Sequence, residues 1–269
     1  MVAFPHCKIN LGLRIVNKRE DGFHNIETCF YPIPWCDVLE VIPSSTFSFN
    51  STGISIPGDK ENNLCVKAYN AMKKKFDLPP VAIHLHKVVP MGAGLGGGSS
   101  DAAFTLKILN ELFSLNLSAQ ELTLEATKLG SDCSFFLFQS AMMGTGRGDE
   151  LSPMNISLAG KFGVIIKPEV HVSTAEAYKN IKPGISDISI KEILETSEVK
   201  DWKMLLFNDF EASVFGRYPS IKKAKESLYE AGALYASMSG SGSSVFGLFS
   251  APVDLKKRFE GLVYWSGNL

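Results

Sequence analysis

Residues 90–101 decide the kind of fold and ligand this chain has: Pro90-Met91-Gly92-Ala93-Gly94-Leu95-Gly96-Gly97-Gly98-Ser99-Ser100-Asp101. The stretch places five glycines and two serines between a strand-like segment, residues 81–89, and a helix-like segment that begins near Ser99. Glycine lets the backbone turn tightly and brings bare N–H groups close to an anion. The first turn of a helix adds unpaired amides and the positive end of its dipole. The stretch therefore predicts a loop that binds phosphate.

Two familiar phosphate loops differ from this stretch. A Walker A loop enters its helix with Gly-Lys-Ser or Gly-Lys-Thr, whereas this helix opens with Ser-Ser-Asp and has no lysine before Lys107. The spacing Gly92-x-Gly94-x-x-Gly97 matches a dinucleotide fingerprint, but a Rossmann unit then needs a second strand that ends in Asp or Glu about 20 residues on. Residues 118–121, Ser-Ala-Gln-Glu, instead predict the capping box of another helix. A plain surface turn is the remaining alternative, and such turns seldom need so many glycines.

Composition restricts the class of protein. The chain has 269 residues, more than one average domain, and 45% of them are hydrophobic. Lysine and arginine number 27 against 28 aspartates and glutamates, so no surface for nucleic acid is indicated. Five cysteines without a CxxC pair argue against a disulfide framework and a zinc site. No apolar run of about 18 residues predicts membrane insertion. We therefore expect a cytoplasmic protein without nucleic-acid, membrane or obligatory protein partners.

The order of the expected elements is that of an α+β chain. Residues 151–160 are rich in Pro, Asn, Ser and Gly and read as a linker, which places a domain boundary between residues 152 and 153. Strands are expected at residues 8–16, 27–30, 38–42, 81–89, 162–167, 234–238 and 244–249. Helices are expected at residues 64–76, 99–113, 119–129, 174–180, 220–231 and 253–262, with others between 190 and 215.

Polar side chains at two places stand among apolar neighbours. Asp132 precedes the apolar run at residues 135–138, where a carboxylate is either the N-terminal cap of a helix or a partly desolvated catalytic group. Lys8 and Asn10 alternate with apolar residues, so they share one face of a strand. That face is either turned to solvent or is the wall of a site. The residues alone leave both questions open.

Several motifs together resemble the GHMP small-molecule kinases, the family of galactokinase, homoserine kinase, mevalonate kinase and phosphomevalonate kinase. They are the glycine-rich stretch and residues 7–11 (Cys-Lys-Ile-Asn-Leu), 21–24 (Asp-Gly-Phe-His), 129–132 (Leu-Gly-Ser-Asp), 144–148 (Gly-Thr-Gly-Arg-Gly) and 239–242 (Ser-Gly-Ser-Gly). The resemblance spans the chain and implies a two-domain α+β fold. The N-terminal domain, residues 1–152, would be like ribosomal protein S5 domain 2, and the C-terminal domain, residues 153–269, would be ferredoxin-like.

The resemblance also implies transfer of the ATP γ-phosphoryl group to an alcohol. Asp132 is then the catalytic aspartate that takes the hydroxyl proton, Lys8 is its catalytic partner, and Asn10 contacts the substrate. Mg²⁺ is expected because ATP brings it, and Ser99 or Ser100 could reach the ion; no metal site made by protein ligands alone is expected. Asp101 stands where some members carry Asn. The implied ATP-binding residues are Asn63, Lys87, Pro90, Gly92, Gly94, Leu95, Gly96, Gly97, Gly98, Ser99, Ser100 and Asp101.

Residues 21–24 bear on the choice of substrate. Phe23 and His24 are either hairpin packing or a flat apolar face beside a hydrogen-bonding ring. The resemblance implies a small-molecule cytidine diphosphate substrate whose base is stacked and read by this pair; a mevalonate, homoserine or sugar kinase, the alternative, would not need it. Residues 239–242 are either a tight hairpin or a loop beside the substrate phosphates. The implied substrate-binding residues are Asn10, Phe23, His24, Phe30, Thr174, Tyr178, Gly240 and Ser241.

Overall fold

The computed structural model describes residues 1–179, 181, 183–184 and 188–269, which form two compact units. Unit 1 consists of Met1–Cys7, Trp35–Met91 and Gly96–Gln139, and unit 2 consists of Lys8–Pro34, Gly92–Leu95 and Ser140–Leu269. Each unit draws on chain segments that are far apart in sequence. The units are therefore a different division from the expected boundary between residues 152 and 153, which stays a prediction.

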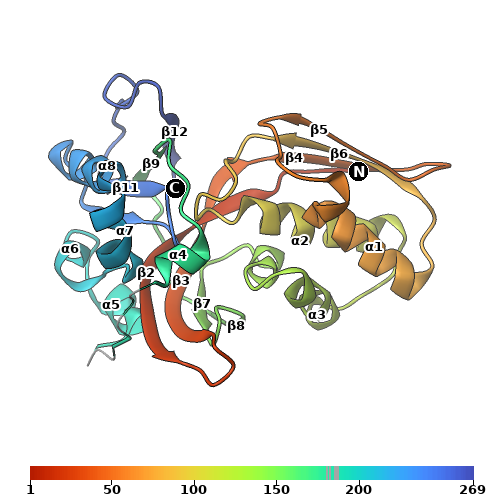
Figure 1. Cartoon of the computed structure of the whole chain (residues 1–269), viewed down its shortest axis with the longest axis horizontal. Helices are drawn as coiled ribbons and strands as arrows, with labels where there is room; N and C mark the ends of the chain where they lie inside the picture. Colours follow the sequence, from red (N-terminus) through yellow and green to blue (C-terminus); the bar gives the residue numbers. More distant parts are fainter. Residues whose placement is uncertain (180, 182, 185–187) are drawn as a thin grey trace. The chain divides into compact units, whose positions relative to one another are not determined.

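Unit 1 packs helices on a sheet with the strand order β1-β4-β6-β5 (Figure 1). The β5 and β6 strands are parallel, and the other neighbours are antiparallel. Sheet residues such as Leu39 and Ile83 share one buried cluster with Tyr69 and Leu106 of the helices. The strands are β1 (Val2–Ala3), β4 (Val38–Pro43), β5 (Ser48–Gly53) and β6 (Val81–Lys87), and the helices are η1 (Lys60–Asn62), α1 (Leu64–Phe76), α2 (Gly97–Leu112), α3 (Ala119–Leu129) and η2 (Cys133–Leu137).

Local capping explains why two of these helices begin where the sequence predicts. Asn63 Oδ1 accepts the Cys65 backbone N–H at 2.9 Å and caps α1. Ser118 and Glu121 form the expected capping box of α3, with the Ser118 backbone N–H donating to Glu121 at 2.9 Å. The predicted bounds of α1 and α3 are confirmed, because interactions within a few residues set them.

Unit 2 contains two sheets, with the strand orders β2-β3-β7-β8 and β10-β11-β9-β12, in the described part of the chain. In the second sheet every neighbouring pair is antiparallel, and β9 lies between β11 and β12. This is the order of the ferredoxin-like split βαβ motif. The strands are β2 (His6–Lys18), β3 (His24–Cys36), β7 (Met142–Thr145), β8 (Glu150–Pro153), β9 (Phe162–Lys167), β10 (Tyr235–Met238), β11 (Val245–Phe249) and β12 (Val263–Asn268).

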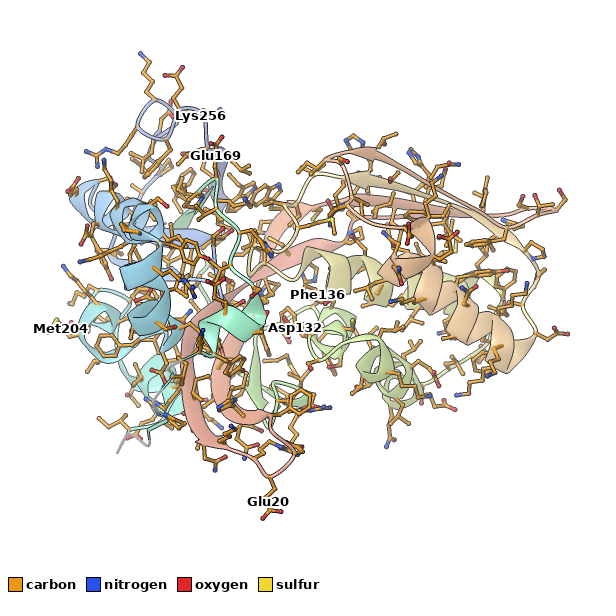
Figure 2. The ribbon with its side chains drawn as sticks, in the orientation of Figure 1. Glu20, Asp132, Phe136, Glu169, Met204 and Lys256 are labelled. Carbon is orange, nitrogen blue, oxygen red and sulfur yellow. The ribbon has the colours of Figure 1, made fainter. Side chains whose placement is uncertain are left out.

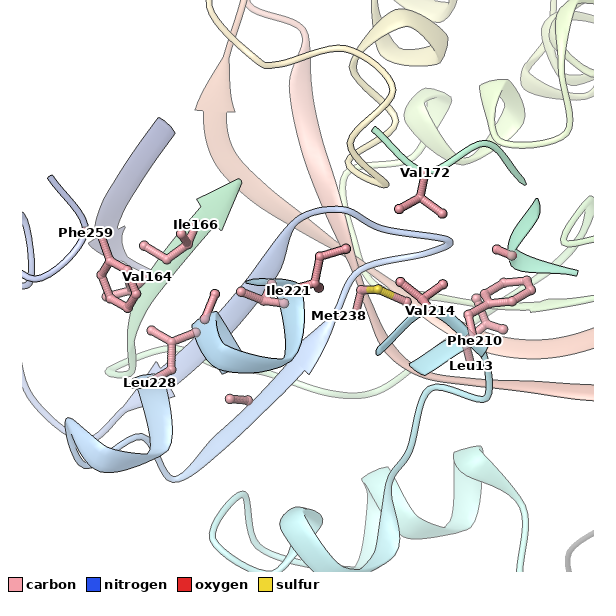
Figure 3. Packing of buried hydrophobic residues seen from close by; sticks show 14 of the residues in the cluster. Leu13, Val164, Ile166, Val172, Phe210, Val214, Ile221, Leu228, Met238 and Phe259 are labelled. Carbon is pink, nitrogen blue, oxygen red and sulfur yellow. The ribbon is translucent and has the colours of Figure 1, made fainter. Parts of the chain in front are cut away.

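Short helices and apolar side chains complete unit 2. Figure 3 shows Val164 and Ile166 of the sheet packed among Ile221, Leu228 and other residues of one buried cluster. The helices in the described residues are α4 (Thr174–Ala177), α5 (Ile190–Thr196), α6 (Trp202–Leu205), α7 (Phe210–Arg217) and α8 (Pro219–Glu230). Residue 180, the end of the helix expected at 174–180, lies outside the described residues.

Two expectations about elements are wrong. Residues 253–262 form turns and no helix, and the chain continues into β12, where Trp265 pairs with Ile165 of β9. Leu255 and Phe259 pack into the buried cluster, and the Leu255 backbone N–H donates to the Tyr264 hydroxyl of β12 at 3.3 Å, so tertiary contacts outweigh the local helical pattern there. The expected linker begins with a strand, β8, and is anchored further on, because the Leu158 backbone N–H donates to the Tyr31 hydroxyl at 3.0 Å. Among the described residues, no helix combines the length and the apolar character needed to cross a membrane.

Candidate functional site

Lys8 and Asn10 share one face of β2, as the alternation predicted. The Lys8 ammonium donates to Asn10 Oδ1 at 2.6 Å, and the Asn10 amide donates to Thr28 Oγ1 of β3 at 2.9 Å. The Lys8 residue is only 3% exposed, so its charge acts in a medium of low dielectric constant. The Phe30 ring lies 5.3 Å from Lys8 Nζ and is 2% exposed. Phe30 thus packs on Lys8, and its contact with the substrate stays a prediction.

The 239–242 loop packs on the first part of the glycine-rich stretch, within unit 2. Ser239 Oγ donates to the Gly94 carbonyl at 2.8 Å, and a Cβ atom on Gly94 would collide with the Ser239 backbone. Gly94 also has a φ of +76°, so contact and conformation both require glycine. The Asn208 amide donates to the Gly240 carbonyl at 2.8 Å and holds the loop in place. The loop is therefore held in place by other parts of unit 2 and is not an isolated hairpin.

Four expected substrate-binding residues lie together in pairs in unit 2. His24 stacks on Tyr178, with ring centroids 4.7 Å apart and an interplanar angle of 18°. Thr174 Oγ1 lies 3.4 Å from Ser241 Oγ. Burial lowers the pKa of His24 below its ordinary value, and the charge of Lys18 acts in the same direction. The imidazole is therefore neutral at physiological pH and can both donate and accept a hydrogen bond.

Phe23 presents an open aromatic surface in unit 2. It is 54% exposed, and its backbone N–H donates to Asp21 Oδ1 at 3.1 Å. The Arg147 guanidinium lies 5.2 Å from the ring centroid, so one cation already contacts the ring. A large exposed apolar ring that is held in place by a turn suits stacking on a flat ligand.

In unit 1, α2 begins without a side-chain cap. Its cap residue, Gly96, has a φ of +69°, and the first turn of α2 contains no acidic side chain. The first four amides of a helix have no partner within the helix. Because no side chain caps α2, its N-terminus suits a bound anion such as phosphate.

The glycines at the start of α2 differ in what they serve. A Cβ atom on Gly97 would lie 2.9 Å from Lys87 Nζ and 3.1 Å from Val89 Cγ1, so packing explains this glycine. A Cβ atom on Gly98 would meet only Leu64 Cδ1, at 3.9 Å. The protein has space for a methyl group at Gly98. Packing within the protein therefore does not require glycine at this position.

A cavity of about 120 Å³ lies beside this helix start. It is smaller than the roughly 300–1,000 Å³ of pockets for whole ligands, so it fits a part of a nucleotide such as a base. Asp101 Oδ1 is buried and has no hydrogen-bond partner among the described residues. A donor on a ligand would satisfy this oxygen. The cavity is lined by Ile56, Pro57, Asp59, Asn62, Asn63, Leu64, Met91, Gly98 and Asp101.

Lys87 and Asp101 are buried together with Asp37, a residue that sequence reasoning missed. Lys87 Nζ donates to Asp101 Oδ2 at 2.8 Å and also to Asp37 Oδ2. Burial alone would lower the pKa of Lys87, but the charges of Asp101 and Asp37 outweigh it and raise that pKa. Burial raises the pKa of Asp101 to about 7, and the charge of Asp37 contributes to the increase. Lys87 is 1% exposed and thus supports the site from within the protein, and its contact with ATP stays a prediction.

Asp132 stands directly before η2, the short helix that contains Phe136 (Figure 2). Its side chain makes no capping hydrogen bond to η2, so the interpretation as a helix cap is wrong. Burial raises the pKa of the neighbouring Cys133 thiol to about 11. Within unit 1, Asp132 directly precedes η2, which packs against α2.

The residues fit a magnesium ion that arrives with a nucleotide. Among the described residues, no three His, Cys, Asp or Glu side chains gather as a metal site. Mg²⁺ often takes most of its ligands from water and substrate phosphates, with few from protein. Ser100 is fully buried and its Oγ has no hydrogen-bond partner in the described part of the chain, whereas Ser99 is partly exposed. Of the two serines, Ser99 is the one placed to reach such an ion.

Sequence reasoning missed three supporting residues: Asp37, Thr28 and Asn208. Thr28 falls in an expected strand, and its polar side chain at an inward position was a usable signal. Asp37 and Asn208 hold groups far away in the chain, and no local pattern identifies such partners.

Two family models match the chain. The model "GHMP kinases N terminal domain" matches residues 63–140, and "GHMP kinases C terminal" matches residues 190–260. A protein of Parabacteroides distasonis named 4-diphosphocytidyl-2-C-methyl-D-erythritol kinase is 48% identical over 271 residues, which cover 100% of both chains. A protein of the same name from Bacteroides thetaiotaomicron is 53% identical over 253 residues, 93% of this chain and 92% of the relative.

Solved structures also resemble the chain over nearly its whole length. A crystal structure of 4-(cytidine 5'-diphospho)-2C-methyl-D-erythritol kinase superposes with a TM-score of 0.84 and 30% identity, over 99% of this chain and 98% of the other. A homoserine kinase from Cytophaga hutchinsonii, at 18% identity and a TM-score of 0.66 over 97% and 93% of the two chains, shares the fold. A mevalonate kinase shares it too, at 13% identity and a TM-score of 0.69 over 99% and 98%.

Proposed function

The chain belongs to the GHMP kinases, ATP-dependent small-molecule kinases, and from this premise we propose that it phosphorylates the 2-hydroxyl of 4-diphosphocytidyl-2-C-methyl-D-erythritol. The reaction belongs to the non-mevalonate route to isoprenoid precursors. Similarity over the whole chain to kinases named for this substrate supports the assignment. The division into domains at residues 1–152 and 153–269 is part of the proposal, and one matched family model falls in each.

A series of contacts within unit 2 supports this choice of substrate. Lys8 is bonded to Asn10, and Asn10 Oδ1 accepts a hydrogen bond from Ser239 at 3.4 Å. In the same loop Ser241 lies near Thr174, at the start of the short helix that leads to Tyr178. Tyr178 then stacks on His24. A phosphate-handling lysine and a base-reading aromatic pair are thus connected through a loop suited to the diphosphate between them.

We propose that Asp132 orients the substrate hydroxyl and takes its proton. Transition states of phosphoryl transfer are loose, so positioning and charge stabilisation supply most of the rate, and the base acts late. The position of Asp132 directly before η2, which packs against α2, supports this role. Lys8 keeps that carboxylate ionised and stabilises the migrating negative charge, which its burial makes more effective.

We propose that ATP lies on unit 1, with its phosphates at the first turn of α2 and its adenine in the adjacent cavity. The uncapped helix and the unpartnered Asp101 Oδ1 support this placement. Bound Mg²⁺ would neutralise charge on the phosphates, and Ser99 would hold it. The five cysteines are free thiols, which fits the expected cytoplasmic compartment.

A panel of alcohols tests the proposal. The purified chain with Mg²⁺ and ATP should phosphorylate 4-diphosphocytidyl-2-C-methyl-D-erythritol with a kcat/KM at least about 100-fold above that for mevalonate, homoserine or a hexose. The Phe23→Ala variant should lose on the order of 1–3 kcal/mol of substrate binding, as expected for one stacked base. His24→Ala should weaken discrimination between the cytosine substrate and its uracil analogue. Preference for another alcohol would leave the family in place and refute the substrate.

A further inference from the structure

Asp37 has no role in the function proposed above, yet it is the most heavily bonded carboxylate near the ATP site. It lies between β3 and β4 and is fully buried. Its Oδ1 accepts the backbone N–H groups of Val88 at 2.6 Å and Val89 at 2.8 Å, and its Oδ2 accepts Lys87 Nζ. These three donors are consecutive in the chain and directly precede Pro90, the first residue of the glycine-rich stretch. Asp37 therefore holds the chain where it enters the loop.

Lys87 extends the same network to the far end of the loop. Its ammonium donates to Asp101 in the second turn of α2. It also lies so close to Gly97 that a Cβ atom there would be 2.9 Å from Nζ. The same Cβ atom would lie 3.1 Å from Val89 Cγ1. Val89, where the loop begins, and Gly97, where it ends, are thus neighbours, and both lie next to the Lys87 ammonium.

We propose that Asp37 is a positioning residue for the nucleotide loop: with Lys87 it holds together the two ends of the loop, at Val89 and at Gly97. Asp37 does not touch the nucleotide. The inference rests on the proposed placement of ATP phosphates at α2. Because loop amides bind phosphate only from fixed positions, releasing one end should weaken ATP binding and leave the cytidine substrate unaffected.

Charge balance makes Asp37→Asn a suitable test. The native cluster has two carboxylates and one ammonium, whereas the variant keeps one of each and has no unpaired buried charge. The Asn side chain retains an oxygen that can accept from Val88 or Val89 but loses the ionic bond to Lys87. The variant should therefore fold while the loop is held less firmly.

Glu125→Gln provides a matched control in the same unit. Glu125 is a buried carboxylate that also accepts from two lysines, Lys75 at 2.7 Å and Lys128 at 3.0 Å. Its partners belong to α1 and α3, away from the loop sequence. The control thus removes a comparable buried charge without altering the loop anchors.

The experiment measures the Kd of Mg²⁺-ATP and of the cytidine substrate by calorimetry on the full chain, together with kcat and both KM values. For Asp37→Asn we expect the ATP Kd and KM to increase at least about tenfold, a smaller change in kcat, and a substrate KM within about twofold. Glu125→Gln should keep ATP affinity within about twofold. Equal ATP affinity in the parent and folded Asp37→Asn would overturn the inference. A parent that binds no ATP would refute the proposed function as well.

Hydrogen exchange gives a second measurement that needs no variant. The amides of Val88 and Val89 donate to a buried carboxylate, so they should exchange only when unit 1 opens. If Asp37→Asn does not fold, fast exchange of these two amides in a parent that binds ATP would overturn the inference. Slow exchange, with protection of residues 90–100 increased by ATP, would support it.

Discussion

At the scale of single residues, Lys8 combines a positive charge with almost complete burial. Its ammonium is held by Asn10 and faces the Phe30 ring, so little freedom is lost when it meets a developing negative charge. Asp132, on its short turn before η2, is not used as a helix cap. The burial of Lys8 does not help to form β2, and the Asp132 side chain does not help to form η2.

If Lys8 and Asp132 act on one transition state, their losses should not add. Asp132→Asn and Lys8→Met, which keep the approximate side-chain volumes, should each lower kcat about 100-fold or more while the ATP Kd stays within about twofold. The double variant should be little worse than the poorer single variant. Steady-state rates and calorimetry measure these quantities. Lys74→Met, on the exposed surface of α1, serves as the control and should retain full activity. A double defect equal to the product of the single defects would contradict the pairing.

At the scale of elements, the start of α2 gives a test that separates binding from folding. Gly98 has room for a methyl group, and alanine favours a helix over glycine by about 0.5–1 kcal/mol. Gly98→Ala should therefore fold at least as stably as the parent yet bind ATP at least about tenfold more weakly, because the methyl group meets the phosphates. Calorimetry and thermal unfolding measure the two effects.

Two other glycines give the comparison for Gly98→Ala. Gly216→Ala lies in α7, where a Cβ atom also meets open space, and it should gain stability without loss of ATP affinity. Gly94→Ala should lose stability, because its Cβ atom collides with the Ser239 backbone at a φ of +76°. Unchanged ATP affinity in folded Gly98→Ala would show that phosphates do not approach α2 at this point.

At the scale of the whole molecule, the buried Asp101 makes stability depend on pH. The pKa of Asp101 is raised from 3.8 in the unfolded chain to about 7 in the fold. Between these values the folded state binds the proton more tightly than the unfolded state, so this group's contribution to stability falls as pH rises from about 4 to about 7 and is constant above.

Asp101→Asn removes that proton equilibrium. Relative to the parent, the melting temperature of Asp101→Asn should therefore improve as pH rises from about 5 to about 8, measured by calorimetry at fixed ionic strength. The exposed Asp59→Asn variant should show no such trend. A parent and an Asp101→Asn variant with parallel pH profiles would mean that Asp101 is ionised throughout this range in the fold.

The sequence by itself determined the elements whose signals are local. Asn63, and Ser118 with Glu121, set the starts of α1 and α3, since a cap and its partner lie within three residues. The glycine-rich stretch and the Lys8–Asn10 alternation predicted a phosphate loop and a polar strand face, and the family followed from motifs in order along the chain.

Only the tertiary structure decided which buried groups belong together. Asp37 and Lys87 are 50 positions apart in the chain. They form an ion pair because both are buried, where an unpaired charge would cost too much free energy. The pairing of β12 with β9, just after the residues 253–262 where a helix was expected, likewise depends on an open sheet edge. The family resemblance assigns Phe30 to the substrate, and only the fold shows that its ring is buried against Lys8. Local pattern specifies short-range hydrogen bonds, whereas desolvation and strand pairing act between residues that only the folded chain brings together.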